Sequence, residues 1–519
     1  MMVKTTDLKY LAIIIVTAFV YSFGLIFFTG VPARYQLNSD AEVHLVHWRE
    51  FSNNGRILLA NDAMFKLDIR PKGELFVDKI IVKIGEFFGF NILSWSVIIS
   101  YISLLIFLSG VYFVVSRSLN NNLMGFLVGL GSIIPAFSLG GSSWGIPANG
   151  FLPRDLALGL AVWLLGLYLF GIKNRSIWSI GLMFLVMGLL ANWYPLLFFH
   201  FSLALILADI IRLRSLNWNH VFYGLIFCTG AVFAISDIVS KSLSFTAINM
   251  EAFRGRFSYL LLESWEYAFL RYLRRFILYL VAVTAIYFAG RKYFSRDSLA
   301  PLKPWYSLWL SSAVLSLLGL YLENYTSFAR FFVSRLSVWF IFSSMVIVAY
   351  NVWLAMSRRS NIGYKILAIF TVMVIFLGQS MIPTAYRNAR DLRANSENYL
   401  KEMATIEKLR EITAPSDLIF MNPDWAGKIR TYGARGTYVS WKDGNIAVLD
   451  GAGALEWSRR LKEADETFNS GSFTKIAAFG RANNIKYFLY NENEITGEQE
   501  IKKHNVFELK PYAVAKIIP

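Results

Sequence analysis

Residues 8–29 carry the sequence LKYLAIIIVTAFVYSFGLIFFT, an apolar run long enough to cross a lipid bilayer as one helix. No small-residue cleavage site follows it, so the run predicts a retained first membrane span rather than a cleaved signal peptide. Directly beyond lies the polar stretch 38–48, NSDAEVHLVHW, which crowds two carboxylates, two histidines and a tryptophan beside the membrane. A cluster of this kind at a membrane surface indicates contact with a polar substrate or an ion.

Apolar runs of similar length recur up to residue 383 and predict a polytopic α-helical membrane protein. Of the 519 residues, 55% are hydrophobic and only 17% are charged, whereas soluble domains carry roughly 25% charged residues. The single cysteine, Cys228, excludes an intramolecular disulfide. We expect about eleven membrane helices from the apolar runs. They cover residues 8–29, 92–116, 123–139, 153–171, 176–191, 195–213, 220–240, 273–290, 305–322, 331–356 and 364–382.

The distribution of charge predicts the orientation of these helices. The chain has a net charge of +16, but residues 384–519 hold 20 Lys/Arg and 18 Asp/Glu. The basic excess therefore lies in the membrane part, where it indicates span orientation and contact with lipid phosphates rather than nucleic acid. With a cytoplasmic amino terminus, the short inside loops are basic, whereas the outside loops 140–152 and 192–194 carry no Lys or Arg. An odd number of spans then places residues 384–519 outside.

Two long loops, 30–91 and 241–272, share that outer side and do not look like simple connectors. Residues 74–88 have apolar side chains at helical spacing, and residues 253–266 combine basic and aromatic side chains. Both segments predict helices that lie in the membrane interface, although ordinary packing at the interface explains them equally well.

Residues 384–519 follow a different pattern and predict a small soluble α/β domain, separate from a membrane domain of residues 1–383. We expect a helix at 391–412 that leads away from the membrane, and further helices at 453–466 and 473–483. Strands are expected at 417–421, 437–441, 485–490, 506–509 and 513–517. The segment contains no glycine-rich phosphate loop, no pair of metal ligands and no Ser/His/Asp arrangement.

The polar stretch after the first span has both a structural and a functional interpretation. Asp40, His44 and His47 are spaced i, i+4, i+7 and would share one helix face. Ser39 and Glu42 fit a capping box, and a helix dipole would favour Asp40 in the first turn, so capping explains these residues without a function. It does not explain the two histidines, whose i, i+3 spacing can bind a metal ion, although a histidine pair alone is weak evidence.

The functional interpretation makes Asp40 a catalytic base, with Glu42 as its rival. A sugar hydroxyl is a poor nucleophile, and a carboxylate within hydrogen-bond reach can take its proton while a donor–phosphate bond breaks. A lipid phosphate leaves as an anion and needs little protonation. It does need positive charge nearby, which arginines or a divalent cation can supply.

Candidates for binding that phosphate or the substrate lie near the predicted outer helix ends. They are His44, His47, Arg154, Asp155, Arg254, Arg256, Arg330 and Arg335. Arg335 falls one turn inside an apolar run, so it is the most costly of the arginines to bury. In the structural interpretation, each arginine extends to lipid headgroups instead, and Asp155 does no more than complement the dipole of its helix.

These features together resemble the GT-C superfamily of polytopic glycosyltransferases, which use polyprenyl-phosphate-linked sugars on the extracytoplasmic side. The resemblance rests on a first span followed by a long outer loop with an acidic pair, here Asp40 and Glu42, on the amphipathic helices of that loop, and on a soluble domain after the spans. It implies that the first-loop carboxylate, Asp40, is the base. The usual pair is an adjacent Asp-Glu, whereas Ala41 separates the two here, so Asp40 and Glu42 both stay candidates.

The carboxyl-terminal segment also resembles the small domain of a poorly characterised group of bacterial membrane proteins. The matching stretch runs from APSDLIF (414–420) through RTYGAR (430–435) and Trp441-Lys442 to EWSRR (456–460). This similarity implies a bacterial inner (plasma) membrane location but says little about activity.

The sequence therefore predicts an integral membrane glycosyltransferase that transfers a sugar from a polyprenyl-phosphate-linked donor to a glycan, lipid or protein acceptor. Its expected partners are the lipid-linked donor, the acceptor and membrane lipids, without nucleic acid, and no cofactor beyond a candidate divalent cation is indicated. Two alternatives stay open: a transporter or flippase of lipid-linked glycans, and a non-catalytic membrane assembly protein. Transporters usually show internal repeats and charges at mid-membrane, and neither is evident in the sequence.

Overall fold

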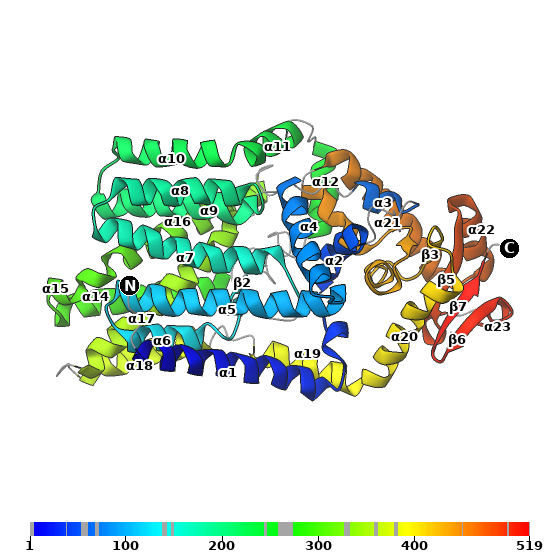
Figure 1. Ribbon diagram of the computed structural model, residues 1–519, viewed down its shortest axis with the longest axis horizontal. Helices are drawn as coiled ribbons and strands as arrows, with labels where there is room; N and C mark the ends of the chain where they lie inside the picture. Colours follow the sequence, from blue (N-terminus) through cyan, green and yellow to red (C-terminus); the bar gives the residue numbers. More distant parts are fainter. Residues whose placement is uncertain are drawn as a thin grey trace.

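The computed structural model describes residues 5–37, 39–52, 61–67, 72–137, 143–146, 150–242, 247–257, 273–325, 333–357, 362–377, 382–448, 450–495 and 498–517. A bundle of long helices occupies one end of the molecule, and a small sheet with its own helices occupies the other (Figure 1). The amino terminus lies at the far end of the bundle from the sheet. Short helices from the two long loops lie between these parts.

Within the described ranges, seven helical segments are long and apolar enough to cross a membrane, and a bent pair raises the number to eight. The seven are built on α1 (Thr5–Thr29), α5 (Ile92–Ser118), α7 (Pro153–Lys173), α9 (Pro195–Leu213), α14 (Arg274–Tyr293), α16 (Lys303–Tyr325) and α17 (Ser337–Ser357). The bent pair joins α10 (Trp218–Gly230) and α11 (Val232–Ser242) at 77°. The remaining apolar helices are shorter: α6 (Asn122–Gly131), α8 (Ile177–Ala191) and α18 (Ile362–Leu377). Each apolar run therefore contains a helix, but the helix expected over 123–139 is wrong beyond Gly131, because Ala136–Phe137 form a short strand, β1, that pairs with β2 (Ser143–Trp144). The number of helices that cross the bilayer stays a prediction.

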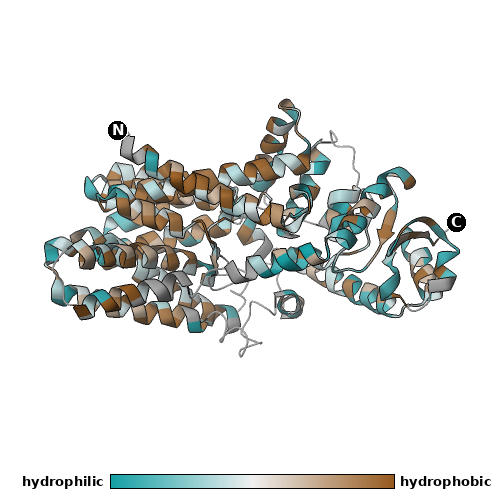
Figure 2. Ribbon diagram, turned by 90° about the horizontal axis from the view of Figure 1, so that it is seen from below, coloured by the Kyte–Doolittle hydropathy of each residue, from teal (hydrophilic) through white to brown (hydrophobic). Residues whose placement is uncertain are grey.

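The bundle is apolar both inside and outside, as a lipid environment requires (Figure 2). α17 lies at its centre, where 89% of its most apolar stretch is buried. α1 lies at the edge, and only 11% of its most apolar stretch is buried. α5 and α7 pack closely because Gly159 leaves room for the backbone of Phe107, 3.2 Å from where a Cβ atom would stand. Large apolar side chains such as Phe27 and Trp178 point outward.

The first long loop forms three helices at the sheet end of the bundle: α2 (Ser39–Ser52), α3 (Ala63–Leu67) and α4 (Lys72–Phe87). α4 turns Phe76, Ile80 and Phe87 outward and buries Glu74 and Asp78 on its other face. A helix that exposes its apolar side suits the predicted position in the membrane interface.

The second long loop behaves differently from that expectation. Its described helix, α12 (Ala247–Phe257), packs against the carboxyl-terminal region through a buried Phe253 and Arg256. Residues 258–272, which complete the predicted interfacial segment, lie outside the described part of the chain.

The carboxyl-terminal region begins with α19 (Ile382–Ala394) and α20 (Ser396–Ile412), which lead from the bundle to a five-stranded sheet. The strand order is β4-β3-β5-β7-β6; β3 pairs in parallel with β4 and β5, and β7 is antiparallel to β5 and β6. The strands are β3 (Leu418–Phe420), β4 (Gly436–Thr437), β5 (Ile485–Asn491), β6 (Asn505–Leu509) and β7 (Tyr512–Lys516). The helices α21 (Gly451–Asn469) and α22 (Phe473–Asn483) connect β4 to β5.

Alternation along the strands divides the sheet between two cores. Ile419 and Leu489 pack with α20 in the core that continues into the bundle, whereas Phe420 and Phe488 pack in a second core with α21 and α22. The prediction of a strand over 437–441 is wrong beyond Thr437, because residues 441–448 turn into a 3-10 helix, η9 (Trp441–Val448).

Candidate active site

Asp40 lies in the first turn of α2, where the first loop meets the carboxyl-terminal region. Its carboxylate is 55% exposed and lies 2.5 Å from the Lys442 ammonium group, which η9 supplies. Burial alone would raise the pKa of the Asp40 carboxyl group. The positive charges of Lys442 and Arg154 outweigh that effect and hold the pKa below its ordinary value, so Asp40 is ionised at neutral pH. We call Asp40, His44, Arg154 and Lys442 the Asp40 cluster.

Glu42 has the opposite environment, although it lies only two residues away on the same helix. It is buried, and burial raises the pKa of its carboxyl group to about 7. The nearby Glu402 adds to that rise, whereas Lys428 and Lys442 lower the pKa. The capping box with Ser39 is not tested, because the Ser39 side chain lies outside the described residues.

An arginine and a carboxylate, Arg154 and Asp155, form the bundle end of the site. Arg154 lies 3.3 Å from Asp155 at the first turn of α7, with Asp155 fully buried and Arg154 partly open. Tyr194, just before α9, interacts electrostatically with Arg154, Arg335 and Asp155. The fold therefore brings Arg154 and Asp155 within electrostatic range of Asp40, and Tyr194 links this pair to Arg335.

His44 and His47 both lie on α2, and each has its own neighbours. His44 Nδ1 lies 3.2 Å from Glu74 Oε1 of α4. His47 is buried, and its ring packs against Phe65 of α3 at 4.8 Å between centroids. The two rings contact different helices, α4 and α3, although their i, i+3 spacing placed them on one helix face. A metal site that joins both histidines stays a prediction.

A different set of residues fits a metal ion. Ligand atoms of His44, Glu74 and Asp78 all lie within 4.8 Å of one another, with both carboxylates buried. One imidazole nitrogen and two carboxylates suit zinc and other divalent cations. His44 belongs to the Asp40 cluster, so an ion here would lie beside the candidate base.

The remaining predicted arginines are not placed at Asp40 by the structure. The Arg256 guanidinium stacks over Trp441 at 3.5 Å and donates to Asn445 Oδ1 at 3.0 Å, so it attaches α12 to η9. Arg254 lies on the same helix, half-buried. Arg330 lies outside the described residues.

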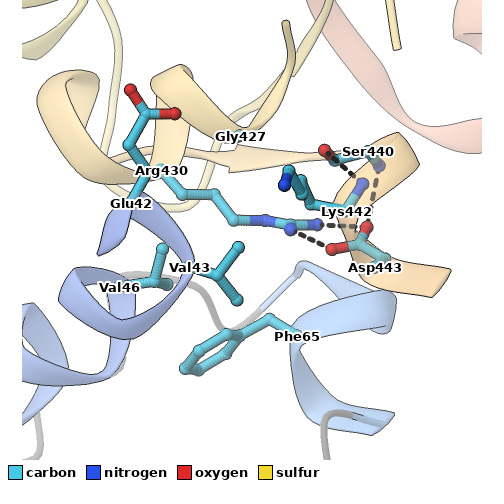
Figure 3. A pocket seen from close by; sticks show the side chains of 9 residues that line it. All are labelled: Glu42, Val43, Val46, Phe65, Gly427, Arg430, Ser440, Lys442 and Asp443. Carbon is cyan, nitrogen blue, oxygen red and sulfur yellow. Dashed lines mark hydrogen bonds and ion pairs between the residues drawn. The ribbon is translucent and has the colours of Figure 1, made fainter. Parts of the chain in front are cut away.

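A second group of charges, which the sequence did not reveal, holds η9 in place (Figure 3). Arg430 donates to Asp62 through Nε at 2.6 Å and Nη2 at 3.0 Å, and also pairs with Asp443. Asp62 accepts a further bond from the Thr437 amide at 2.9 Å. We call Asp62, Arg430 and Asp443 the Arg430 cluster. It links the first loop to the carboxyl-terminal region and fixes the segment that carries Lys442.

Between α2, α3 and η9 lies a small pocket that joins the two clusters. Glu42, Val43, Val46 and Phe65 face Gly427, Arg430, Ser440, Lys442 and Asp443 across it (Figure 3). The pocket brings the loop that the sequence analysis singled out against a segment that lies almost four hundred residues later in the chain.

Sequence reasoning missed Lys442, Glu74 and Asp78 as site residues. Glu74 and Asp78 carry a usable signal: spaced i, i+4, they place two acids on one face of an otherwise apolar helix. Nothing in the sequence pairs Lys442 with Asp40, since their contact depends on how the carboxyl-terminal region docks.

The arrangement of the whole chain is similar to solved structures of an oligosaccharyltransferase from Archaeoglobus fulgidus. The apo form superposes with a TM-score of 0.53 at 11% sequence identity, over 95% of this chain and 70% of that one. The form tethered to an acceptor peptide containing an NVT sequon gives 0.50 at 10% identity, over 94% and 69%. Neither family models nor curated protein sequences match this chain. The likeness confirms the predicted GT-C fold, which that oligosaccharyltransferase shares.

Proposed function

We propose that this chain is a membrane glycosyltransferase that transfers a sugar from a polyprenyl-phosphate-linked donor to an acceptor. The observation that carries the proposal is the Asp40 cluster, a half-exposed carboxylate held between Lys442 and Arg154. The cluster lies at the end of the bundle where α4 turns its apolar face outward. A lipid donor could reach this place from the bilayer and an acceptor from water. The GT-C fold is consistent with this chemistry.

In the proposed reaction Asp40 is the base. Its carboxylate takes the proton of the acceptor hydroxyl while that oxygen forms a bond to the anomeric carbon of the sugar. The bond between the anomeric carbon and the phosphate oxygen breaks, and the lipid phosphate leaves as an anion. Lys442 and Arg154 stabilise the charge that develops on this phosphate, with Arg335 close to Tyr194 as a further donor.

A divalent cation fits the same proposal. His44, Glu74 and Asp78 would hold it, and it would supply positive charge near the leaving phosphate. Glu42 stays behind Asp40 as the rival base. Its pKa of about 7 suits proton transfer near neutrality, but its burial keeps it from solvent.

The proposal includes the topology deduced from charge. The amino terminus lies in the cytoplasm, and loops 30–91 and 241–272 lie on the extracytoplasmic side of a bacterial inner membrane. The domain of residues 384–519 lies there too and closes the site against the membrane domain of residues 1–383. All the long connections then meet at the outer surface, where the Asp40 cluster lies.

Transfer in proteoliposomes tests this function. The purified chain is given a radiolabelled polyprenyl-phosphate sugar and a mixture of glycan, peptide and lipid acceptors, and the label is followed from donor to acceptor. We expect transfer by the wild type and by Asp391→Asn, an exposed acid paired with Arg390, and none by Asp40→Asn. Movement of the donor across the bilayer without covalent transfer would instead show a transporter. Label that moves equally well with Asp40→Asn would remove Asp40 from the chemistry.

A further inference from the structure

A second pocket lies in the carboxyl-terminal region, apart from the cavity beside Arg430. Its walls are α20, the segment that follows β3, the end of β5 and the start of β7. Met421 and Asn422 directly follow β3, while Tyr490 and Asn491 end β5. The pocket therefore opens at the carboxyl ends of two adjacent parallel strands.

The topology of the sheet makes this position a crevice. From β3 the chain continues to β4 on one side, and from β5 it continues to β6 and β7 on the other side. The connection that leaves β3 and the connection that leaves β5 therefore run toward opposite edges of the sheet, which leaves a gap outside the carboxyl ends of these two strands. Open α/β sheets bind ligands at such a switch point. The location alone, before any side chain is considered, favours a binding site.

The side chains around the gap are aromatic and amide groups. Tyr399, Trp425, Tyr490 and Tyr512 supply rings, and Trp425 is 52% exposed, so its ring is available to a ligand. Asn422 and Asn491 add amide groups. Their oxygens accept from the backbone N–H groups of Asp424 and Asn493, at 3.1 and 2.9 Å, and their NH2 groups can donate to sugar hydroxyls. Flat rings stack on the apolar C–H faces of a pyranose, and amides and carboxylates bind its hydroxyl groups.

The charges in the pocket further limit the chemical class of ligand that it can bind. Among the described residues that line the pocket, Glu402 and Glu494 are the acids and Lys428 is the one cation. The Lys428 ammonium group lies 2.9 Å from Glu402 and over the rings of Tyr399 and Trp425, at 4.8 and 4.7 Å from their centroids. The remaining negative charge disfavours phosphate, so the donor's leaving group does not belong here. A neutral saccharide or an amino sugar fits.

The pocket also lies within electrostatic range of Glu42, the rival base. Lys428 and Glu402 line it, and both interact electrostatically with the buried Glu42, which in turn lines the pocket beside Lys442. Tyr399 likewise interacts with Glu42. We propose that this pocket, at the carboxyl ends of β3 and β5, binds the saccharide of a glycan acceptor. The inference rests on the proposed function and selects a glycan among the three acceptor classes.

Direct binding tests the inference without a donor. The full-length chain in lipid nanodiscs is titrated with cellobiose, N,N′-diacetylchitobiose and glucosamine, and with inorganic phosphate and a neutral peptide for comparison, by saturation-transfer NMR and calorimetry. We expect a saccharide to bind, with no binding of phosphate or peptide at this pocket. Trp425→Ala should weaken saccharide binding about tenfold. Trp218→Ala, which removes an exposed tryptophan of α10, should not change it.

Transfer kinetics separate the failure of this inference from the failure of the proposed function. With a saccharide acceptor, Trp425→Ala should raise KM about tenfold and leave kcat nearly unchanged. Transfer with an unaltered KM in Trp425→Ala would overturn the pocket and keep the function. Saccharide binding that depends on Trp425, without any transfer, would keep the pocket and overturn the function. If only the peptide binds, or if no saccharide binds, the inference is wrong.

Discussion

The Asp40 cluster and the Arg430 cluster are built alike but differ in exposure. Each joins a carboxylate of the first loop to a cation of the carboxyl-terminal region. Asp40 is 55% exposed, whereas Arg430 and Asp62 are 6% and 0% exposed. A buried charge must be fully paired, so the Arg430 cluster has little freedom to exchange partners. In the partly exposed pair of Asp40 and Lys442, with exposed fractions of 55% and 20%, the ionic contact contributes less to stability, and Asp40 can exchange Lys442 for a substrate. If the proposed function holds, the more exposed Asp40 cluster carries the chemistry, while the buried Arg430 cluster holds the two regions together.

The largest expected effect is on the chemistry of the Asp40 cluster. Asp40→Asn should lower the transfer rate by about 10²–10⁴-fold, the usual contribution of a general base. The unfolding temperature should hardly change, because the Asp40 pair is exposed. Transfer assays and thermal unfolding of the same preparation check both statements. A variant that keeps its rate but unfolds early would reverse the assignments of the two clusters.

The next effect concerns the stability of the Arg430 cluster. Arg430→Met leaves Asp62 and Asp443 buried without their cation, which should cost about 3–5 kcal/mol of unfolding free energy. Denaturant unfolding measures the loss. Arg459→Met serves as the control, because Arg459 is an exposed arginine paired with two glutamates, and it should cost less than about 1 kcal/mol. Equal stabilities of the two variants would contradict the docking role.

Glu42 lies between the clusters and should make stability depend on pH. Its pKa is about 7 in the folded chain and 4.5 when unperturbed, so the folded state binds the extra proton between these values. Stability should then fall as the pH rises from 4.5 to 7, by roughly 3 kcal/mol in total. Glu42→Gln, which stays neutral, should abolish this decrease. Unfolding of both proteins across that range measures it, and parallel curves would show that Glu42 ionises normally.

A divalent cation would sharpen the comparison, because the one group of candidate metal ligands among the described residues includes His44 of the Asp40 cluster and no member of the Arg430 cluster. If His44, Glu74 and Asp78 bind zinc or manganese, the ion should stabilise the wild type by up to about 2.7 kcal/mol at 100 times its dissociation constant. Chelation should remove that gain, and Asp78→Asn should show none. Thermal shift with each metal, with and without EDTA, makes the measurement. Stabilisation that persists in Asp78→Asn would place the ion elsewhere.

The smallest expected effect is a change in the pH profile of transfer. Lys442 is one of the charges that hold the pKa of Asp40 below its ordinary value, so Lys442→Gln should raise that pKa. Because Asp40 acts as a base when ionised, the acid limb of the rate profile should move to higher pH. Lys462→Gln, an exposed lysine of α21, should leave the limb in place. An unmoved limb in Lys442→Gln would mean that Lys442 does not act on the group that titrates.

The sequence by itself determined most of the helices and strands, and it pointed to Asp40 and Glu42 as candidate site residues. Apolar runs predict helices because a chain in lipid must satisfy its backbone hydrogen bonds within each segment. Local alternation of apolar residues predicts the strands between residues 418 and 516. The exception is the end of 437–441, where the Ser440 amide donates to the Asp443 carboxylate instead of to a neighbouring strand. Asp40 was evident because a polar cluster next to a membrane span is costly without a purpose.

Only the tertiary structure decided which residues meet Asp40. Lys442 reaches it across a separation of 402 residues, and Asp62 meets Arg430 across 368. The packing of the first loop likewise decides that His44 contacts α4 and His47 contacts α3, although the helical period had placed both on one face. Contacts of this kind depend on how two folded parts fit together, which no local pattern in the sequence records. Local physics therefore sets the elements of this protein, and the packing of its two ends against each other sets the site.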